Sequence, residues 1–519
     1  MGRLDEGGPR GECAGLKSLL EDITSTIALA FGPVLQLAEA MFNIGPKMDV
    51  DIVTAGVWVP IVTAIMADAG IKMAIFSPGI ASILQQNYLA LDSFMGNLAE
   101  RLLSSSSGEN GASKGSAPDS LYFQPKTSAA TIQYAQERIY SHPKTAEFST
   151  RWNLPIYYQL RFGECCNRLN EAVEHIRLGG WIAEVYTGDQ QTAESLKNRF
   201  GFELSFFLEL YDILLGLWRP DVILRPLTNR FLKGAVQLVG RSVAFIQEGM
   251  DGKIKFGKEK EPDTSENGNN TNGSALPYPT RSPYCWGDSP QDVAAVAWEL
   301  AILETTMSHD YVTTVCEALD SRDSTEDDRI ELRSLVSDVF KETSSQIQPI
   351  IERAWNEIIV KILTEKCSGP LAAVKGVAAT YRMTNRPPPT QASPFIATIL
   401  RPLKEFDLEF ANRTPDNIGD QWKTLIITAI TDQYTVAMEE LISTVKKTDV
   451  ALQNRRTTRR AASGGISDGD KVKLQLYLDY KQYSRHVQEL GVNPSEIPGI
   501  AKLESLTLEG SQLQSQNGT

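Results

Sequence analysis

Cysteine and histidine are scarce in this sequence, which has six cysteines and four histidines in 519 residues. A disulfide-based fold needs a denser set of cysteines, and no CxxC pair is present to begin a zinc site. We therefore expect free thiols in a reducing compartment and no metal site. The cysteines are Cys13, Cys165, Cys166, Cys285, Cys316 and Cys367, and the histidines are His142, His175, His309 and His486.

Positive charge is also in deficit. The 51 basic residues are outnumbered by 64 acidic ones, which gives a net charge of −13. Because nucleic-acid binding requires a basic face, this balance argues against nucleic-acid partners. One compact basic cluster stands out, Arg455, Arg456, Arg459 and Arg460. It is interpreted either as a membrane-surface or localisation signal or as a solvated helix end, and we favour the helix end.

Long uncharged runs are missing. The first residues, MGRLDEGGPR, lack the apolar stretch of a secretory signal. Residues 23–38 and 52–67 are uncharged, but each is interrupted by a proline, Pro33 or Pro60, and each is shorter than the roughly 20 residues that a membrane span requires. We expect both runs to be buried helices of a soluble protein.

Catalytic signatures are absent as well. The sequence has no GxSxG, HExxH or Walker A motif, and GGISDGDK at 464–471 lacks the Gly-Lys-Ser/Thr that holds phosphates. His309 and Asp310 are adjacent, but neighbours on a helix point about 100° apart, which favours solvated surface over an acid–base pair. The sequence predicts a protein that is not an enzyme, with no catalytic residue, cofactor or metal.

The stretch RWNLPIYYQLRF, residues 151–162, is the most informative local pattern. Its alternating apolar positions suit a half-buried strand, but Pro155 would remove a ladder hydrogen bond. Farther on, apolar or small side chains recur every three or four residues from Tyr158 to Ile176, which is typical of one helix face. We predict a helix over about 155–177, with Asn153 as its cap.

The aromatic side chains of this stretch have two interpretations. If Trp152, Tyr158 and Phe162 face a bundle interior, replacing Phe162 with Ala is expected to cost about 3–5 kcal/mol of stability. If they form an exposed binding patch, the same change would leave folding intact and weaken partner capture. We favour the interior.

Helical periodicity dominates the rest of the chain. One face of DVAAVAWELAILETTM carries Val293, Val296, Leu300, Leu303 and Met307, and a second stripe runs from Ile427 to Val445. A last helix is predicted over 468–490, with a Ser467 cap near Asp470, Lys471 in its first turn and Gly491 just past its end. Its inward positions are Val472, Leu476, Tyr483, Val487 and Leu490. The predicted fold class is all-α, an elongated rod of stacked helical bundles.

Small, polar segments divide this predicted rod. From the N-terminus we expect a disordered segment (1–14), a helical region (15–103), a flexible linker (104–118) and a bundle (119–249). A disordered linker (250–290) leads to a second bundle (291–454), a basic, glycine-containing linker (455–466), the terminal helix (467–492) and a mostly disordered tail (493–519).

Four segments together resemble the second-subunit family of the conserved oligomeric Golgi (COG) tethering complex. They are RWNLPIYYQLRF (151–162), WRPDVILRPLTNRF (218–231), YRMTNRPPPTQASPFIATILRPL (381–403) and GGISDGDKVKLQLYLDYKQYSRHVQELGV (464–492), in the family's order. The matching positions, expected to be mainly structural, are Trp152, Asn153, Leu154, Pro155, Tyr157, Arg161, Phe162, Trp218, Asp221, Pro226, Arg230, Tyr381, Arg382, Thr384, Asn385, Ser467, Asp468, Asp470 and Lys471.

The resemblance implies a non-catalytic tethering subunit on the cytosolic face of the Golgi. Such a subunit would act in intra-Golgi retrograde transport and, indirectly, in glycosylation. The implied partners are the other COG subunits, SNAREs, Rab GTPases and golgins, with peripheral membrane contact. Family members carry an additional N-terminal coiled coil, and no long heptad array precedes residue 45, so the chain is expected to be truncated or to begin at an unusual start. A helical scaffold of cytosol or nucleus stays open as the alternative.

Overall fold

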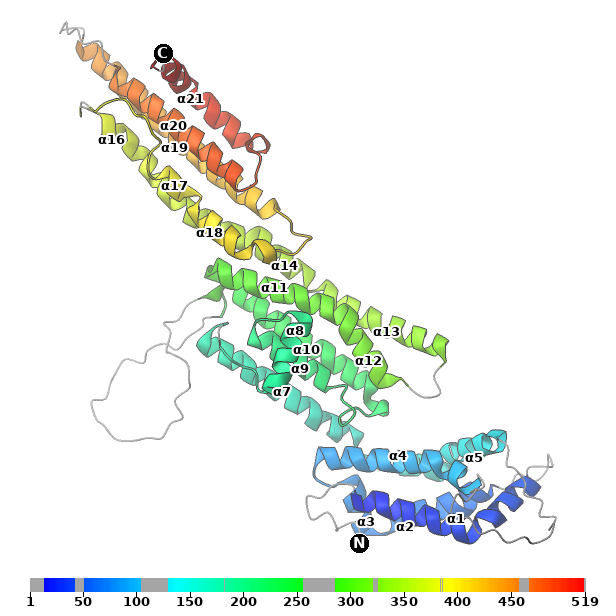
Figure 1. Cartoon of the computed structure of the whole chain (residues 1–519). Coiled ribbons are helices and arrows are strands. Elements are labelled where there is room, and N and C mark those ends of the chain that lie inside the picture. Colours follow the sequence, from blue (N-terminus) through cyan, green and yellow to red (C-terminus); the bar gives the residue numbers. More distant parts are fainter. Residues whose placement is uncertain are drawn as a thin grey trace, which may run out of the picture. The chain divides into compact units, whose positions relative to one another are not determined.

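The computed structural model describes residues 14–42, 51–103, 129–181, 183–254, 285–320, 325–382, 384, 386–456 and 466–517. Every regular element in these residues is a helix and none is a strand (Figure 1), which confirms the predicted all-α class. The chain packs as two compact units, residues 1–167 with 215–235 and residues 168–214 with 236–519. The predicted linkers at 104–118 and 250–290 do not coincide with this division. The stacking of bundles into a rod stays a prediction.

The helices are distributed as follows. The first unit contains α1 (Ala14–Phe42), η1 (Val53–Trp58), α2 (Val59–Ala67), α3 (Ala69–Phe76), α4 (Ala81–Leu103), α5 (Ala129–Ser141), α6 (Pro143–Ser149) and η2 (Arg225–Leu227). Helices α7 (Leu154–Gly179), α9 (Ser205–Gly216) and α10 (Thr228–Met250) contribute residues to both units. The second unit also contains α8 (Gln190–Phe200), η3 (Trp286–Asp288), α11 (Pro290–Thr306), η4 (Met307–Tyr311), α12 (Val312–Leu319), α13 (Glu326–Ser345), α14 (Gln348–Arg353), η5 (Ala354–Ile359), α15 (Val360–Ser368), η6 (Gly369–Gly376), α16 (Val377–Tyr381), α17 (Ile396–Ile399), α18 (Arg401–Phe410), η7 (Ala411–Arg413), α19 (Gln421–Arg456), α20 (Asp468–Glu489), η8 (Pro494–Glu496) and α21 (Pro498–Asn517).

The two helices predicted in most detail are confirmed. Helix α7 begins one residue before the predicted start, and the Asn153 side chain accepts a hydrogen bond from the Ile156 N–H at 3.4 Å. Helix α20 begins after Ser467, whose hydroxyl accepts from the Asp470 N–H at 3.1 Å. It ends before Gly491, whose φ of 80° is the left-handed conformation that glycine adopts at little cost.

The core of the first unit is aromatic. Trp58 is fully buried, and its indole N–H donates to the Thr145 hydroxyl at 2.7 Å. The rings of Phe94 and Phe148 lie 6.3 and 5.8 Å from it, between centroids. Helix α4 supplies one side of this core and packs against α1 and α5. Residues far apart in the sequence therefore close the bundle around one tryptophan.

The expectation that the uncharged runs are buried is wrong for much of residues 23–38. In helix α1 the side chain of Leu29 is 89% exposed, and Phe31, Val34 and Leu37 are also exposed. Helix α1 packs mainly against α4, which leaves these apolar side chains on its other faces exposed. In the described parts of the chain no single helix is long and apolar enough to cross a membrane, although the pair Val53–Ala67 and Ala69–Phe76, bent by 95°, meets that test together.

The second unit has the predicted helix stripes at its core. The five positions of the α11 and η4 stripe are all buried, as are the five inward positions predicted for the terminal helix. Along α19, Ile427, Ile430 and Tyr434 are buried, whereas Ala437 is half-buried. A cluster of Trp355, Phe406 and Trp422, with ring centroids 5.4 to 6.1 Å apart, joins η5, α18 and α19.

The prediction of a mostly disordered tail at 493–519 is wrong. Residues 498–517 form helix α21, which packs against α19 and α20 (Figure 1). Its buried face carries Ile500, Leu503 and Thr507. Two glycines allow close approach. A Cβ on Gly510 would lie 2.8 Å from the Tyr477 Cβ, and one on Gly499 would lie 2.8 Å from the Thr431 Cγ2. Helix α21 therefore packs through small residues and a narrow apolar stripe. Sequence patterns identify helices most readily by a broad apolar stripe.

The predicted linker at 250–290 is also too long. Trp286 is fully buried, with its ring centroid 5.3 Å from that of Trp181, and it packs against Gly249, where any side chain would overlap its indole. A single tryptophan in a polar, proline-containing segment gives no periodicity to detect. Three predicted segments fall wholly or mostly outside the described residues: the disordered segment 1–14, the linker 104–118 and the basic linker 455–466. Of these, Ala14, Arg455, Arg456 and Ile466 are described, and α19 ends at Arg456.

Candidate functional site

The first two family-like segments meet within the first unit. Tyr157 is 1% exposed, and its hydroxyl donates to the Val222 carbonyl oxygen at 2.5 Å. Burial raises the pKa of this phenol above its ordinary value, so the hydroxyl remains protonated as a donor. Trp218, four residues before Val222, is buried as well. A hydrogen bond between positions 65 residues apart thus ties the start of α7 to the segment before α10.

Trp152 anchors the other side of this junction. Its ring is buried and lies edge-on to Phe76 and Tyr88, at 4.7 and 5.2 Å between centroids. Phe148 packs against it at 6.3 Å. Such edge-to-face pairs add about 0.5–1.5 kcal/mol each beyond the area they bury. The interior position predicted for Trp152 is confirmed.

The interior position predicted for Tyr158 and Phe162 is only partly right. Both rings are half-buried and stack at 5.4 Å with an 8° interplanar angle, over Gly234 of α10. Phe231, fully buried, meets Tyr158 edge-on at 5.4 Å. The buried side chain is the odd-numbered Tyr157, because the helix turns its 157 face toward the 218–222 segment. The expected cost of 3–5 kcal/mol for Phe162→Ala is too large for a half-buried ring.

The remaining signature positions of this unit have smaller roles. Leu154 and Pro155 form the first turn of α7, where proline loses no helical hydrogen bond. Arg161 pairs with Glu164 at 3.2 Å, and Asp221 pairs with Arg219 at 3.1 Å. Pro226 is the second residue of the short η2 turn and is exposed.

Arg230 places its guanidinium 6.0 Å from the centre of the Tyr158 ring. The distance suits a weak cation–π interaction, which at an exposed site is worth about 0.5–1 kcal/mol. Arg230 is exposed, so this contact joins α10 to α7 at the surface.

The third and fourth family-like segments meet in the second unit, around a buried carboxylate. Asp479 of α20 is fully buried, and its two oxygens accept from the Ser393 N–H at 2.6 Å and the Ser393 hydroxyl at 2.8 Å. Gln475 donates from one Nε2 to Asp479 at 2.8 Å and to the Gln391 carbonyl at 3.0 Å. Tyr381 donates its hydroxyl proton to Gln475 Oε1 at 2.7 Å.

The Asp479 network has a structural role. Burial raises the pKa of Asp479 above its ordinary value, while the bonds from Ser393 and Gln475 oppose that rise. The carboxylate accepts three hydrogen bonds from the protein, two at Oδ1 and one at Oδ2. These bonds hold the 390–394 segment against α20.

The cap residues lie at the N-terminal end of α20. Asp468 approaches Lys471 at 3.6 Å, and Asp470 accepts from the Ser467 hydroxyl at 2.8 Å, so these four predicted positions form the helix start. In the third segment Arg382 is exposed, Thr384 donates to the Thr380 carbonyl at 2.8 Å, and Asn385 lies outside the described residues.

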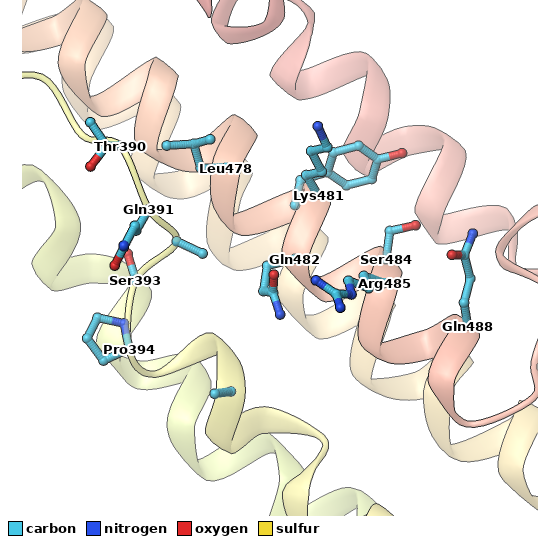
Figure 2. Close-up of a pocket in the computed structure, with 13 residues that line it drawn as sticks. Thr390, Gln391, Ser393, Pro394, Leu478, Lys481, Gln482, Ser484, Arg485 and Gln488 are labelled. Carbon is cyan, nitrogen blue, oxygen red and sulfur yellow. The ribbon is translucent and has the colours of Figure 1, made fainter.

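A groove lies between the 390–397 segment and α20. It has a volume of about 780 Å³ and is lined by thirteen residues (Figure 2). Figure 2 shows Gln482 and Arg485 projecting from α20 into the space that faces Gln391, Ser393 and Pro394. One wall of the groove is therefore the 390–394 segment, which Asp479 holds through its hydrogen bonds to Ser393.

Sequence analysis missed the polar residues that hold these sites. Gln475 and Asp479 lie within the quoted 464–492 segment, and the signal that marks them is polarity on the inward face of an otherwise apolar stripe. Glu299 of α11 is another such residue: it is 1% exposed and accepts from the Glu203 and Leu204 N–H groups at 2.6 and 3.2 Å. Burial raises its pKa to about 7.

Glu209 is the third buried acid that sequence analysis missed. It is fully buried and accepts from Arg168 Nε at 2.8 Å and from the Thr187 N–H at 2.8 Å. Arg168 also pairs with Asp212 at 2.8 Å. These partners compensate the burial of the charge and connect α7 to α9.

The buried acids of these clusters bond to other parts of the protein. In the described part of the chain, no three His, Cys, Asp or Glu side chains converge to hold a metal ion. His309 is exposed, and its neighbour Asp310 pairs with Arg199 at 3.0 Å, as expected of solvated surface. What the described residues offer is packed helix surface and the groove beside α20.

Comparison with known proteins gives a single family. The model described as "COG complex component, COG2, C-terminal" matches residues 150–480. The chain is similar to conserved oligomeric Golgi complex subunit 2 of Arabidopsis thaliana, at 26% identity over 68% of this chain and 43% of the relative. It is also similar to the Homo sapiens subunit 2, at 23% identity over 72% of this chain and 50% of the relative. The chain thus spans about half the length of the curated relatives it matches. No solved structure matches it.

Proposed function

This chain belongs to the family of COG complex component COG2, C-terminal, and from this premise we propose that it is a non-catalytic subunit of a Golgi vesicle-tethering complex. In that role it supports intra-Golgi retrograde transport, Golgi organisation and, indirectly, protein glycosylation. The observation that carries the proposal is the match over residues 150–480, which includes both segments that meet at Tyr157 and most of both segments that meet at Asp479.

The proposal places the chain at the cytosolic face of Golgi membranes as a peripheral component. Its partners are the other COG subunits, and further partners are SNAREs, Rab GTPases and golgins. The helical units contribute surface rather than chemistry, because a permanent complex is held by large apolar interfaces. The exposed apolar side chains of α1, such as Leu29 and Val34, are of the kind that such an interface buries.

The signature positions act structurally in this proposal. Together they hold the folds that present the partner surfaces. They are Trp152, Asn153, Leu154, Pro155, Tyr157, Arg161, Phe162, Trp218, Asp221, Pro226, Arg230, Tyr381, Arg382, Thr384, Asn385, Ser467, Asp468, Asp470 and Lys471.

Localisation and co-purification test the proposal. The tagged chain, expressed at its natural level, is expected on perinuclear cisternae and is expected to co-purify with sibling COG subunits identified by mass spectrometry. Alkaline or high-salt washing should release it from membranes, because peripheral association rests on exposed contacts. Nuclear or diffuse cytosolic signal without sibling subunits would instead support the alternative, a helical scaffold unrelated to tethering.

A further inference from the structure

We propose that the groove between residues 390–397 and helix α20 binds an acidic, extended peptide segment of a partner protein. The inference gives the proposed tethering subunit a specific docking surface, but it rests on the groove itself. The test measures peptide binding by the purified full chain. A negative result would leave the tethering proposal standing, and failure of the tethering proposal would leave the peptide-binding proposal standing.

One wall of the groove is built in advance. Pro387, Pro388 and Pro389 restrict the chain before the groove to an extended path, and residues 386–390 form no helix. Ser393 is then fixed by its two hydrogen bonds to Asp479. The main chain at Gln391 is fixed by Gln475. A wall that is already ordered loses little conformational entropy when a ligand binds, which favours affinity.

The charge of the groove is opposite to that of the chain. Lys481 and Arg485 line it, and none of its thirteen described lining residues is an aspartate or glutamate. Asp479, behind the groove, is bonded to Ser393. Glu489 pairs with Arg485 at 3.4 Å at the end of the groove and offsets part of its charge. In a chain with a net charge of −13, this basic hollow selects acidic over basic ligands.

The hollow continues along α20. A second hollow of about 240 Å³ shares Ala397 with the first and lies between α18 and the last turns of α20. Here the charges are paired, Arg401 with Glu405 at 2.7 Å and Lys404 with Glu489 at 3.3 Å. Leu408 at its edge is 77% exposed. The first hollow is therefore basic. The second is close to neutral, and Leu408 adds an apolar contact at its edge.

The lining favours an extended peptide over a helix. Between Leu478 and Gln488 the helix rises about 15 Å, which matches roughly five extended residues. Thr390, Gln391, Ser484 and Gln488 supply hydroxyl and amide groups along this length. Such groups bond to the free N–H and C=O groups of an extended backbone, whereas a helix has already paired its own.

The two walls of the groove favour a peptide over an anionic membrane surface. The Arg485 side chain is 69% exposed, but it projects from α20 toward the facing 390–394 segment and does not stand on a single convex face (Figure 2). A single chain enters such a hollow and contacts both walls. The membrane is therefore treated as the competing outcome in the test.

The test is a selection from random peptides of about seven residues, a length that slightly exceeds the groove. The purified full chain is expected to enrich sequences rich in Asp and Glu. Synthetic copies of these peptides should bind the Lys481→Glu, Arg485→Glu double variant about tenfold or more weakly, and their affinity for the original chain should fall with added salt. The control is Lys341→Glu with Lys361→Glu, which changes the net charge equally at exposed lysines of the same unit that do not line the groove.

Two results would overturn the proposal. One is enrichment of peptides without an acidic bias; the other is equal loss of binding in the groove variant and the control variant. Circular dichroism melts of both variants exclude unfolding as the cause. Vesicles that contain phosphatidylserine are assayed in parallel, and vesicle binding that depends on Lys481 and Arg485, without peptide enrichment, would assign the surface to membranes and reject the peptide.

Discussion

Buried acidic residues connect segments that are far apart in this sequence. Asp479 holds Ser393 across 86 positions, Glu299 holds Glu203 across 96, and Glu209 holds Arg168 across 41. Each accepts hydrogen bonds that compensate part of its desolvation. At the scale of single residues, the fold is therefore specified by polar groups on otherwise apolar helix faces.

Asp479→Ala is expected to release the 390–394 segment. The Ser393 N–H loses its acceptor, so hydrogen exchange at Ser393 should accelerate by about tenfold or more. Asp479→Asn is the matched control, because its amide oxygen still accepts from this N–H and its shape is preserved. The measurement is hydrogen exchange of the peptide that contains Ser393. Equal exchange in the alanine and asparagine variants would contradict the role given to the carboxylate.

Glu299 should make stability depend on pH. Burial raises its pKa from 4.5 to about 7 in the folded chain. Between these values the folded state retains a proton that the unfolded state has lost, so this group's contribution to stability falls as pH rises from about 4.5 to 7 and is constant above. The difference of 7 − 4.5 = 2.5 pKa units corresponds to about 3 kcal/mol at most.

The Glu299→Gln variant tests this dependence. Glutamine still accepts from the Glu203 and Leu204 N–H groups but carries no charge at any pH. Its melting temperature, relative to that of the original chain, should therefore rise between pH 5 and pH 8. Two melting profiles that remain parallel over this range would show that Glu299 does not titrate there.

At the scale of elements, close approach depends on glycine. Helix α21 reaches α20 at Gly510 and α19 at Gly499, where any Cβ would overlap a neighbour. Helix α10 provides the contrast, since a Cβ on Gly240 would meet no atom within 4 Å. The same substitution therefore has opposite expected effects in two helices.

Gly510→Ala is expected to separate α21 from α20. The new methyl would lie against the Lys473 main-chain carbonyl and 2.8 Å from the Tyr477 Cβ, so the helix must shift as a whole. Limited proteolysis should then cleave residues 498–517 faster than in the original chain. Gly240→Ala is the control and should raise stability by about 1 kcal/mol, because alanine favours helix. Equal protease resistance of the Gly510→Ala variant and the original chain would refute the packing of α21.

The elements that sequence analysis predicted well are those with wide apolar stripes. Helices α7, α11, α19 and α20 have repeats long enough to stand out, and α20 also has a cap and a terminal glycine. Helix α21 was missed because a glycine and a threonine, Gly510 and Thr507, lie on its buried face. The burial of Trp286 was missed because it depends on space left at Gly249, which no local pattern encodes.

At the scale of the whole molecule, the division into two units follows contacts rather than linkers. Residues 215–235 belong with 1–167 because Tyr157 binds the Val222 carbonyl and Phe231 packs on Tyr158. The sequence placed residues 119–249 in one bundle, since every segment between two polar linkers looks continuous. The groove was equally hidden, because its walls lie more than 80 positions apart and are joined by Gln475 and Asp479.

The proposed function depends on features at all three scales: packed helices and a groove, in a chain that belongs to the family of a tethering subunit. Its central claim is that glycosylation depends on this chain indirectly, through the recycling of Golgi enzymes. The most direct measurement is the processing of cell-surface glycans after depletion of the protein, alongside glycosyltransferase activity in lysates of the same cells. We predict under-processed glycans with undiminished enzyme activity in the lysate, because the enzymes are misplaced rather than inactive. Fully processed glycans after complete depletion would contradict the account.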